Sequence, residues 1–141
     1  MAKGKHAMAS GITRMRNARG VQTGTRMICC DNSGCKEAMV IGVKGFGGRL
    51  NRLPCATVGD VVMATCKKGK PELRKKVVLG VVARQKRPIR RRDGSHWRFQ
   101  DNALILISVK GDMVATQVNG PVAREVCEMW PKISSQCQAI I

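Results

Sequence analysis

The sequence predicts a mainly β protein, a small antiparallel barrel or sandwich, and three observations support this prediction. Short apolar runs recur from residue 25 onward, turn-forming residues separate them, and no helical pattern lies between them. The 141 residues suffice for one domain with a real core and are too few for two ordinary domains. Apolar residues make up 43% of the chain, and most are aliphatic side chains that suit a core.

The first element expected is a basic, flexible N-terminal arm over residues 1–24, ahead of a single domain at 25–141. Four glycines interrupt scattered Lys and Arg side chains in this arm, and it contains no acidic residue. Such a segment has no core to join, so we expect it to become ordered on a partner.

Five apolar runs are the predicted strands of the domain, and each is bounded by turn formers. The first run ends at the turn-forming cluster 31–34, the second ends at the glycine-rich segment 45–48, and residues 110–112 close the fifth. The five runs cover residues 27–30, 38–43, 61–66, 77–83 and 103–109, and residues 113–118 are a candidate for a further strand.

Only the C-terminal part shows helical periodicity. Pro121 stands where a helix can begin, and Val122, Val126 and Trp130 recur at the spacing of one helix face. Pro131 stops or bends this helix. A second short helix is expected within residues 133–140.

The net charge of +17 is concentrated in three segments. Residues 1–26 carry +6, residues 67–76 carry +5, and residues 84–98 carry +6, so the rest of the chain is neutral. A partner with dense negative charge is favoured, because each cation that neutralises a phosphate releases condensed counterions. With two Trp, two Phe and no Tyr, recognition of folded RNA or a duplex through phosphate and shape is favoured over base stacking.

The segment 67–76 lies between two predicted strands and is expected to project six cations from one edge of the barrel. The alternative is a solvated run of charge that contacts nothing. Surface charges kept only for solubility usually mix both signs, whereas this segment contains a single acid, Glu72. The pattern therefore favours a binding loop.

The segment 84–98 is expected to form a protruding basic β-ribbon. Asp93-Gly94 is a strong hairpin signal, and arginine, which dominates the segment, can bind phosphate through two parallel hydrogen bonds. Residues 90–92 are expected to face outward. The alternative is a mobile excursion that is disordered without its partner.

A third candidate site is the glycine-rich segment 44–52, where backbone N–H groups could approach a phosphate beside Arg49 and Arg52. The segment lacks the spacing of a Walker loop and of a dinucleotide-binding motif, which argues against a nucleotide cofactor.

Catalysis and metal binding find little support. The seven cysteines are an odd number without a C-x-x-C pair, so neither a disulfide framework nor a zinc ribbon is indicated. Cys29, Cys30 and Cys35 are the closest metal candidate, and small buried hydrophobes in a reducing compartment are the favoured alternative. His6 and His96 lie in basic segments without a carboxylate partner in sequence. We expect no catalytic residue, metal, cofactor or membrane span.

Several motifs resemble the universal large-subunit ribosomal protein L-fourteen family, in its archaeal and eukaryotic branch, whose older eukaryotic name is L-twenty-three. The resemblance covers roughly residues 20–141. The residues that carry it lie in segments 31–34, 48–54, 58–65, 67–77, 91–94, 101–103, 120–123 and 130–131.

This resemblance implies a five-stranded barrel with a protruding ribbon and short C-terminal helices, placed on the intersubunit face of the large ribosomal subunit. The implied partners are large-subunit ribosomal RNA, small-subunit ribosomal RNA across bridges, ribosomal proteins L-three and L-twenty-four and, in eukaryotes, initiation factor six. The implied RNA contacts are Arg49, Arg52, Lys67, Lys68, Lys70, Arg74, Lys75, Lys76, Arg84, Lys86, Arg87, Arg90, Arg91, Arg92 and Arg98. The implied protein contacts are Trp130, Ile133, Ile140 and Ile141.

The leading hypothesis is thus a structural, non-enzymatic ribosomal component of the cytosolic ribosome, nucleolar during assembly in a eukaryote. Two alternatives stay open from the residues alone. One is a basic barrel that cycles on and off its target, such as a translation factor or a nucleoid protein. The other is an enzyme with a cysteine nucleophile.

Overall fold

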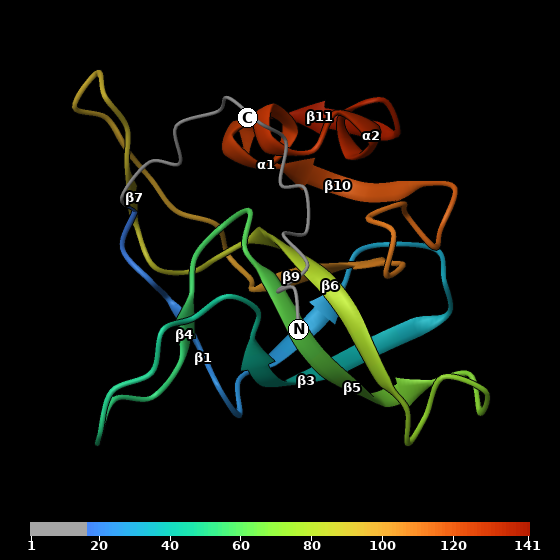
Figure 1. Cartoon of the computed structure of the whole chain (residues 1–141). Coiled ribbons are helices and arrows are strands. Elements are labelled where there is room, and N and C mark those ends of the chain that lie inside the picture. Colours follow the sequence, from blue (N-terminus) through green and yellow to red (C-terminus); the bar gives the residue numbers. More distant parts are fainter. Residues whose placement is uncertain (1–16) are drawn as a thin grey trace.

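Five strands close into a barrel in the computed structural model, which describes residues 17–141 (Figure 1). Each of the five predicted apolar runs supplies one strand, so the predicted barrel is confirmed and the sandwich is wrong. In barrel order the strands are β2 (Arg26–Cys29), β3 (Cys35–Val43), β5 (Val61–Gly69), β6 (Val77–Arg84) and β9 (Ala103–Ile107).

The barrel is mixed, which corrects the antiparallel prediction. Strands β2 and β9 pair in parallel, with Ile28 opposite Ala103, while the other four neighbouring pairs are antiparallel. The reason is geometric: strand direction alternates around an all-antiparallel ring, and an odd number of strands cannot alternate and still close. At least one parallel pair is therefore required.

Successive side chains of each barrel strand point alternately into and out of the barrel, and those that point inward form the core. In β2, Met27 and Cys29 are buried, whereas Arg26 and Ile28 are exposed. Strand β9 is buried throughout, because the C-terminal segment covers the outer face, and Val118, Val122 and Val126 join the same core cluster. Each fully buried Val or Leu side chain stabilises the fold by about 1.5–3 kcal/mol.

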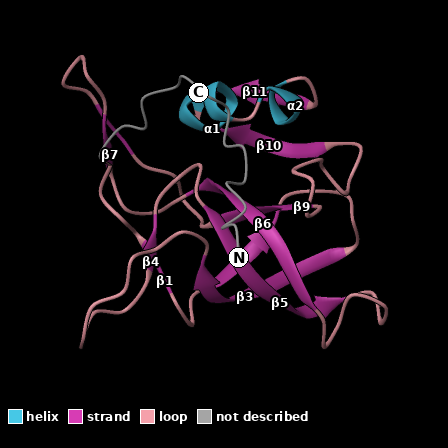
Figure 2. Ribbon diagram, in the orientation of Figure 1, coloured by secondary structure: helices cyan, strands magenta, loops and turns pink. Residues whose placement is uncertain are grey.

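Short paired strands and two helices lie outside the barrel. Figure 2 shows both helices together with β10 and β11 at one end of the molecule. The antiparallel pairs are β1 (Val21–Gln22) with β4 (Cys55–Ala56) and β7 (Ile89–Arg90) with β8 (His96–Trp97). The parallel pair is β10 (Val118–Val122) with β11 (Cys137–Ile140), and the helices are α1 (Arg124–Met129) and α2 (Pro131–Ser134).

The C-terminal prediction is correct in kind and wrong in its bounds. Pro121 lies in β10 rather than at a helix start, since Val122 pairs with Ile140 of a strand that the sequence had suggested as helix. Helix α1 therefore begins only at Arg124, and Pro131 begins α2. Of the candidate strand 113–118, only a single isolated bridge, between Met113 and Ile107, forms before β10 begins at Val118.

Residues upstream of the predicted boundary at residue 25 also pack on the domain. Val21 is fully buried, and the carbonyl of Ala18 accepts hydrogen bonds from the side chains of Thr57 and Gln85. Residues 17–24 are thus packed on the domain, while residues 1–16 of the predicted arm lie outside the described residues.

Candidate nucleic-acid interface

The predicted basic loop 67–76 is loop only over residues 70–76, because residues 67–69 still belong to β5. The whole segment, for which we keep the name loop 67–76, leads to the start of β6 and projects from the barrel at the lower right of Figure 1. All six of its cations are exposed. They are Lys67, Lys68, Lys70, Arg74, Lys75 and Lys76. This agrees with a cationic loop at one edge of the barrel.

A concave region with a volume of about 680 Å³ lies at the base of this loop. Its cationic lining residues are Lys36, Lys67, Lys68, Lys70 and Arg74, with Gly34 and Gly69 between them. Sequence reasoning missed Lys36, because this residue stands beside Glu37 and far from the basic run. Only the pairing of β3 with β5 brings Lys36 to the loop.

Glu37 is the acid that balances part of this charge. Its carboxylate lies 2.8 Å from the Lys68 ammonium and 3.3 Å from the Arg26 guanidinium. The hydrogen bond from Lys68, with the nearby Lys68 and Arg26 charges, holds the pKa of Glu37 below its usual range. Lys68 thus shares its charge with a carboxylate of the chain.

The predicted β-ribbon is present, and it is the hairpin at the upper left of Figure 1. Arg90 pairs with His96, and Gly94 takes a φ of 85° in the connecting turn. The Asp93 carboxylate accepts hydrogen bonds from the hydroxyl and the backbone N–H of Ser95, which lower the pKa of Asp93. The turn chemistry read from Asp93-Gly94 is thus confirmed.

Arg91 is turned toward the protein, which corrects the expectation that 90–92 all face outward. Its Nε lies 2.9 Å from a carboxylate oxygen of Glu125 in α1, and its Nη2 donates to the main-chain oxygen of Ile141 at 2.7 Å. The guanidinium also stacks over the Trp97 ring at 4.7 Å. Arg91 fastens the ribbon to the C-terminal segment.

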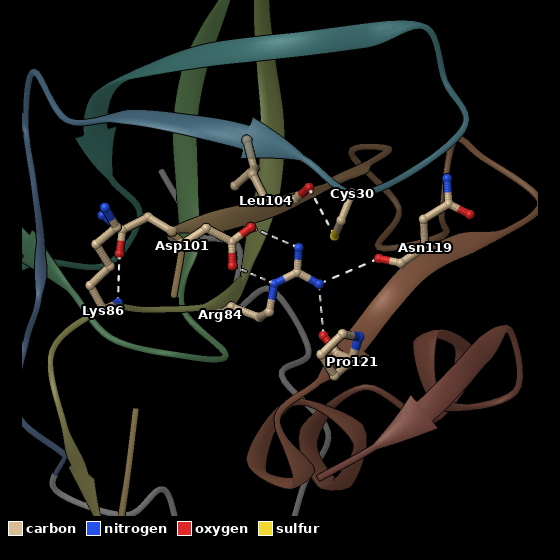
Figure 3. A network of polar contacts seen from close by, with 8 residues as sticks. Cys30, Arg84, Lys86, Asp101, Leu104, Asn119 and Pro121 are labelled. Atoms are coloured by element: carbon tan, nitrogen blue, oxygen red, sulfur yellow. Dashed lines mark hydrogen bonds and ion pairs between the residues drawn. The ribbon is translucent and has the colours of Figure 1, made fainter. Parts of the chain in front are cut away.

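Arg84 is the clearest departure from the predicted RNA contacts, because its side chain is only 9% exposed. Figure 3 shows its guanidinium bonded on one side to both oxygens of Asp101, each at 2.9 Å. On the other side it donates to the carbonyls of Pro121 at 2.8 Å and Asn119 at 3.4 Å. Arg84 therefore joins the barrel to β10 and is not placed to bind a phosphate.

The remaining ribbon cations are exposed, as the prediction requires. These are Lys86, Arg87, Arg90, Arg92 and Arg98. The ribbon and the loop 67–76 project from opposite sides of the barrel in Figure 1. A polyanion that contacts both must therefore extend across the molecule.

In the glycine-rich segment 44–52, Arg49 and Arg52 are exposed and lie on a turn in which the Arg52 N–H donates to the Arg49 carbonyl. A cavity of about 260 Å³ beside the turn is lined by cationic residues that include Arg19, Lys44 and Arg52. The Arg19 guanidinium lies 5.2 Å from the centroid of the Phe46 ring. The sequence did not indicate that Arg19 would join this site.

The four predicted protein contacts differ in their accessibility. Ile133 is 1% exposed and belongs to the core, so it cannot bind a partner without unfolding of α2. Trp130 is half-buried, and its indole N–H donates to the Gly59 carbonyl at 3.1 Å. Ile140 is 46% exposed, and Ile141 is half-buried. Ile140 offers the most accessible apolar surface of the four.

Within residues 17–141, all seven cysteines carry free thiols, and no cluster of three or more His, Cys, Asp or Glu is arranged to hold a metal ion. No helix in this part of the chain is long and apolar enough to cross a membrane.

The fold and its exposed charge define a small basic β-barrel protein whose cations project on separate loops and suit a polyanionic partner.

The chain belongs to the ribosomal protein L14p/L23e family, whose model matches residues 20–141. It is 49% identical over 133 residues to the large ribosomal subunit protein uL14 of Candida albicans, covering 94% of this chain and 96% of the relative. The A and B forms of uL14 in Saccharomyces cerevisiae are each 47% identical over 129 residues, covering 92% of this chain and 94% of the relatives. The chain is thus a structural ribosomal protein and not an enzyme.

Proposed function

We propose that the chain is a structural constituent of the large ribosomal subunit, and that it binds large-subunit ribosomal RNA through phosphate and shape contacts. The observation that carries this proposal is the set of exposed cations on the loop 67–76 and the ribbon 84–98. Family membership and the names of the relatives support the same placement.

The charge on these projections favours phosphate contact as the main source of binding energy. The loop itself contains one acid, Glu72, and a second acid, Glu37 of the neighbouring strand β3, pairs with Lys68. Five loop cations besides Lys68 are exposed and suit phosphates. In the ribbon, exposed arginines such as Arg90 and Arg92 can each bind a phosphate through two hydrogen bonds.

The finer placement is also part of the proposal. The protein lies on the intersubunit face of the large subunit and contributes to bridges with small-subunit ribosomal RNA. Ribosomal proteins L-three and L-twenty-four are neighbours. The C-terminal surface around Trp130 and Ile140 receives initiation factor six in a eukaryote, and the protein works in the cytosolic ribosome after nucleolar assembly.

The salt dependence of binding tests the phosphate contacts. The full chain is titrated with large-subunit ribosomal RNA at increasing salt. Neutralisation of six phosphates gives a log–log slope of about −5 on the duplex value. A slope near zero would contradict binding through phosphates.

Matched variants locate the contacts. Changing Lys67, Lys75 and Lys76 together to Gln should reduce the magnitude of the slope by about 3, since each lost phosphate contact removes about one unit. Lys132→Gln is the control, because Lys132 pairs with Asp112 at the C-terminal end of the molecule. Equal slopes for the triple variant and the control would place the RNA elsewhere.

Sedimentation through a high-salt cushion separates a constituent from a cycling factor. A constituent stays with the large subunit, because many contacts must break at once for release. A protein recovered entirely in the supernatant would indicate a factor that binds reversibly.

A further inference from the structure

Three thiols from adjacent strands meet at the base of the loop 67–76. They are Cys29 of β2, Cys35 of β3 and Cys66 of β5, and all are buried. The Sγ atoms of Cys35 and Cys66 lie 3.0 Å apart. A disulfide bond is about 2.05 Å long, so a shift of about 1 Å would bring the two sulfurs to bonding distance.

The pair is directly connected to the basic loop. Cys66 immediately precedes Lys67, and its Sγ lies 3.2 Å from the Lys68 carbonyl oxygen. Cys66 also forms an isolated bridge with Arg74, on the returning side of the loop. Cys35 pairs with Gly69 across the sheet. Both sides of the loop therefore touch this thiol pair.

We propose that Cys35 and Cys66 are an oxidative modification site, a dithiol that hydrogen peroxide converts to a disulfide, which ties β3 to the base of the loop 67–76. Disulfides in cytosolic proteins are commonly of this transient, redox-sensing kind. Neither the family nor the proposed RNA contacts require this reaction.

The surroundings of the three thiols assign different roles to them. The hydrogen bond from the Cys29 thiol, helped by the one from Cys66, lowers the pKa of Cys35 to about 7 against the opposing effect of burial. Burial and the adjoining Cys35 sulfur raise the pKa of Cys66 to about 11. The pKa of Cys29 is also raised, first by its hydrogen bond to Cys35. Because the thiolate is the nucleophile, Cys35 is the sulfur that attacks first.

The reaction balances with the peroxide as the only oxidant. The Cys35 thiolate attacks one peroxide oxygen, so that an S–O bond forms and the O–O bond breaks; the departing hydroxide takes a proton and leaves as water. The Cys66 sulfur, losing its proton, then attacks the Cys35 sulfenic acid. The S–S bond forms, the S–O bond breaks, and a second water departs with that proton. Two thiols are oxidised, and one peroxide is reduced to two waters.

Hydrogen peroxide added to the reduced full chain tests the proposal. Tryptic peptides are analysed by mass spectrometry without reducing agent. The expected product is peptide 27–36 joined to peptide 53–67, lighter by two hydrogen atoms and separated again by dithiothreitol, with fragment ions that place the bond between Cys35 and Cys66. A bond between Cys29 and Cys35 within peptide 27–36, or Cys35 oxidised without any cross-link, would overturn the assignment.

Matched variants make the assignment specific. Cys66→Ala should abolish the cross-link, whereas Cys55→Ala, at a more exposed thiol on β4, should leave its yield unchanged. Thermal melts establish that both variants fold. If Cys66→Ala does not fold, alkylation of native wild-type protein before and after peroxide gives the answer, since Cys35 and Cys66 should lose reactivity together. Oxidation of Cys55 alone, at doses that leave the pair reduced, would overturn the proposal.

A second measurement tests the connection to the loop. The disulfide holds the two sides of the loop on β3, so trypsin should cleave after the loop lysines several-fold more slowly in oxidised Cys55→Ala protein than in the reduced form. An unchanged cleavage rate in fully cross-linked protein would show that the bond does not restrain the loop.

Discussion

The guanidinium of Arg84 and the carboxylate of Asp101 form a bidentate ion pair, with both N–O distances 2.9 Å, at the junction between β6 and the C-terminal segment. The same guanidinium donates to the carbonyls of Pro121 and Asn119. Each donor thus satisfies an acceptor on an element that is distant in sequence. A residue that appears in sequence as the first cation of a basic ribbon is in fact part of the fold.

Replacing Arg84 should therefore destabilise the protein. Arg84→Met keeps much of the side-chain volume and leaves Asp101 and two carbonyls without their donor, so the free energy of unfolding should fall by about 3 kcal/mol. Arg98→Met, at an exposed ribbon position, is the control and should change it by less than about 0.5 kcal/mol. Urea unfolding followed by circular dichroism measures both. Equal losses would show that the ion pair does not stabilise the fold.

Arg91 and its neighbours in the ribbon should separate stability from RNA binding. The Arg91 and Glu125 side chains are only 12% and 10% exposed, so Arg91→Ala leaves a nearly buried carboxylate unpaired and should cost about 3 kcal/mol. Changing exposed Arg90 and Arg92 together to Ala should leave the melting temperature nearly unchanged and weaken RNA binding. Thermal melts and RNA titrations of the two variants test this. A lower melting temperature for the double variant alone would contradict it.

Because of the Glu37 ion pairs, we expect the free energy of unfolding to depend on pH in the acid range. The hydrogen bond and charge of Lys68, together with the Arg26 charge, lower the pKa of Glu37 in the folded protein. The ion pairs therefore contribute their full stabilisation above about pH 4.3, the pKa of an unperturbed Glu. The contribution is lost as the pH falls from there through the folded pKa. Glu37→Gln should thus flatten the decline of the unfolding free energy in this range at low salt. Parallel curves for wild type and variant would contradict the prediction.

The strands could be predicted from the sequence, because each barrel strand combines apolar β-formers with turn residues at its ends. The predicted run 61–66 and the observed β5 differ mainly because β5 continues to Gly69, where pairing with Cys35 extends it. The hairpin could also be predicted from the sequence, since its turn is made by adjacent residues. Local chemistry therefore suffices where the contacts themselves are local.

The roles of Arg84 and Arg91 could not be predicted, because their partners Asp101 and Glu125 are 17 and 34 residues away. A basic segment gives no signal that distinguishes a cation paired with the fold from one that faces solvent. The strand β11 was missed for a related reason: its short apolar run suits either a helix or a strand, and only pairing with β10 decides.

Gly80 lies at a close approach between two strands of the barrel. It lies in β6 opposite Leu106, and a Cβ atom there would lie 2.7 Å from the Cγ of Leu104 and 2.9 Å from the Ile105 carbonyl oxygen. A backbone oxygen cannot move aside as a flexible side chain can, so Gly80→Ala should cost about 1–3 kcal/mol of unfolding free energy. Gly47→Ala is the control, because a Cβ atom there meets nothing within 4 Å.

A double-mutant cycle identifies the atoms responsible for this cost. Leu104→Ala removes the Cγ atom and leaves a cavity that a methyl group at position 80 partly fills, so the Gly80→Ala, Leu104→Ala double variant should lose less stability than the two single losses combined. Urea unfolding of the four proteins gives the interaction energy, expected to be about 1 kcal/mol in the favourable direction. Strict additivity, or a cost for Gly80→Ala no larger than that for Gly47→Ala, would show that β6 and β9 are not packed as closely as these distances require.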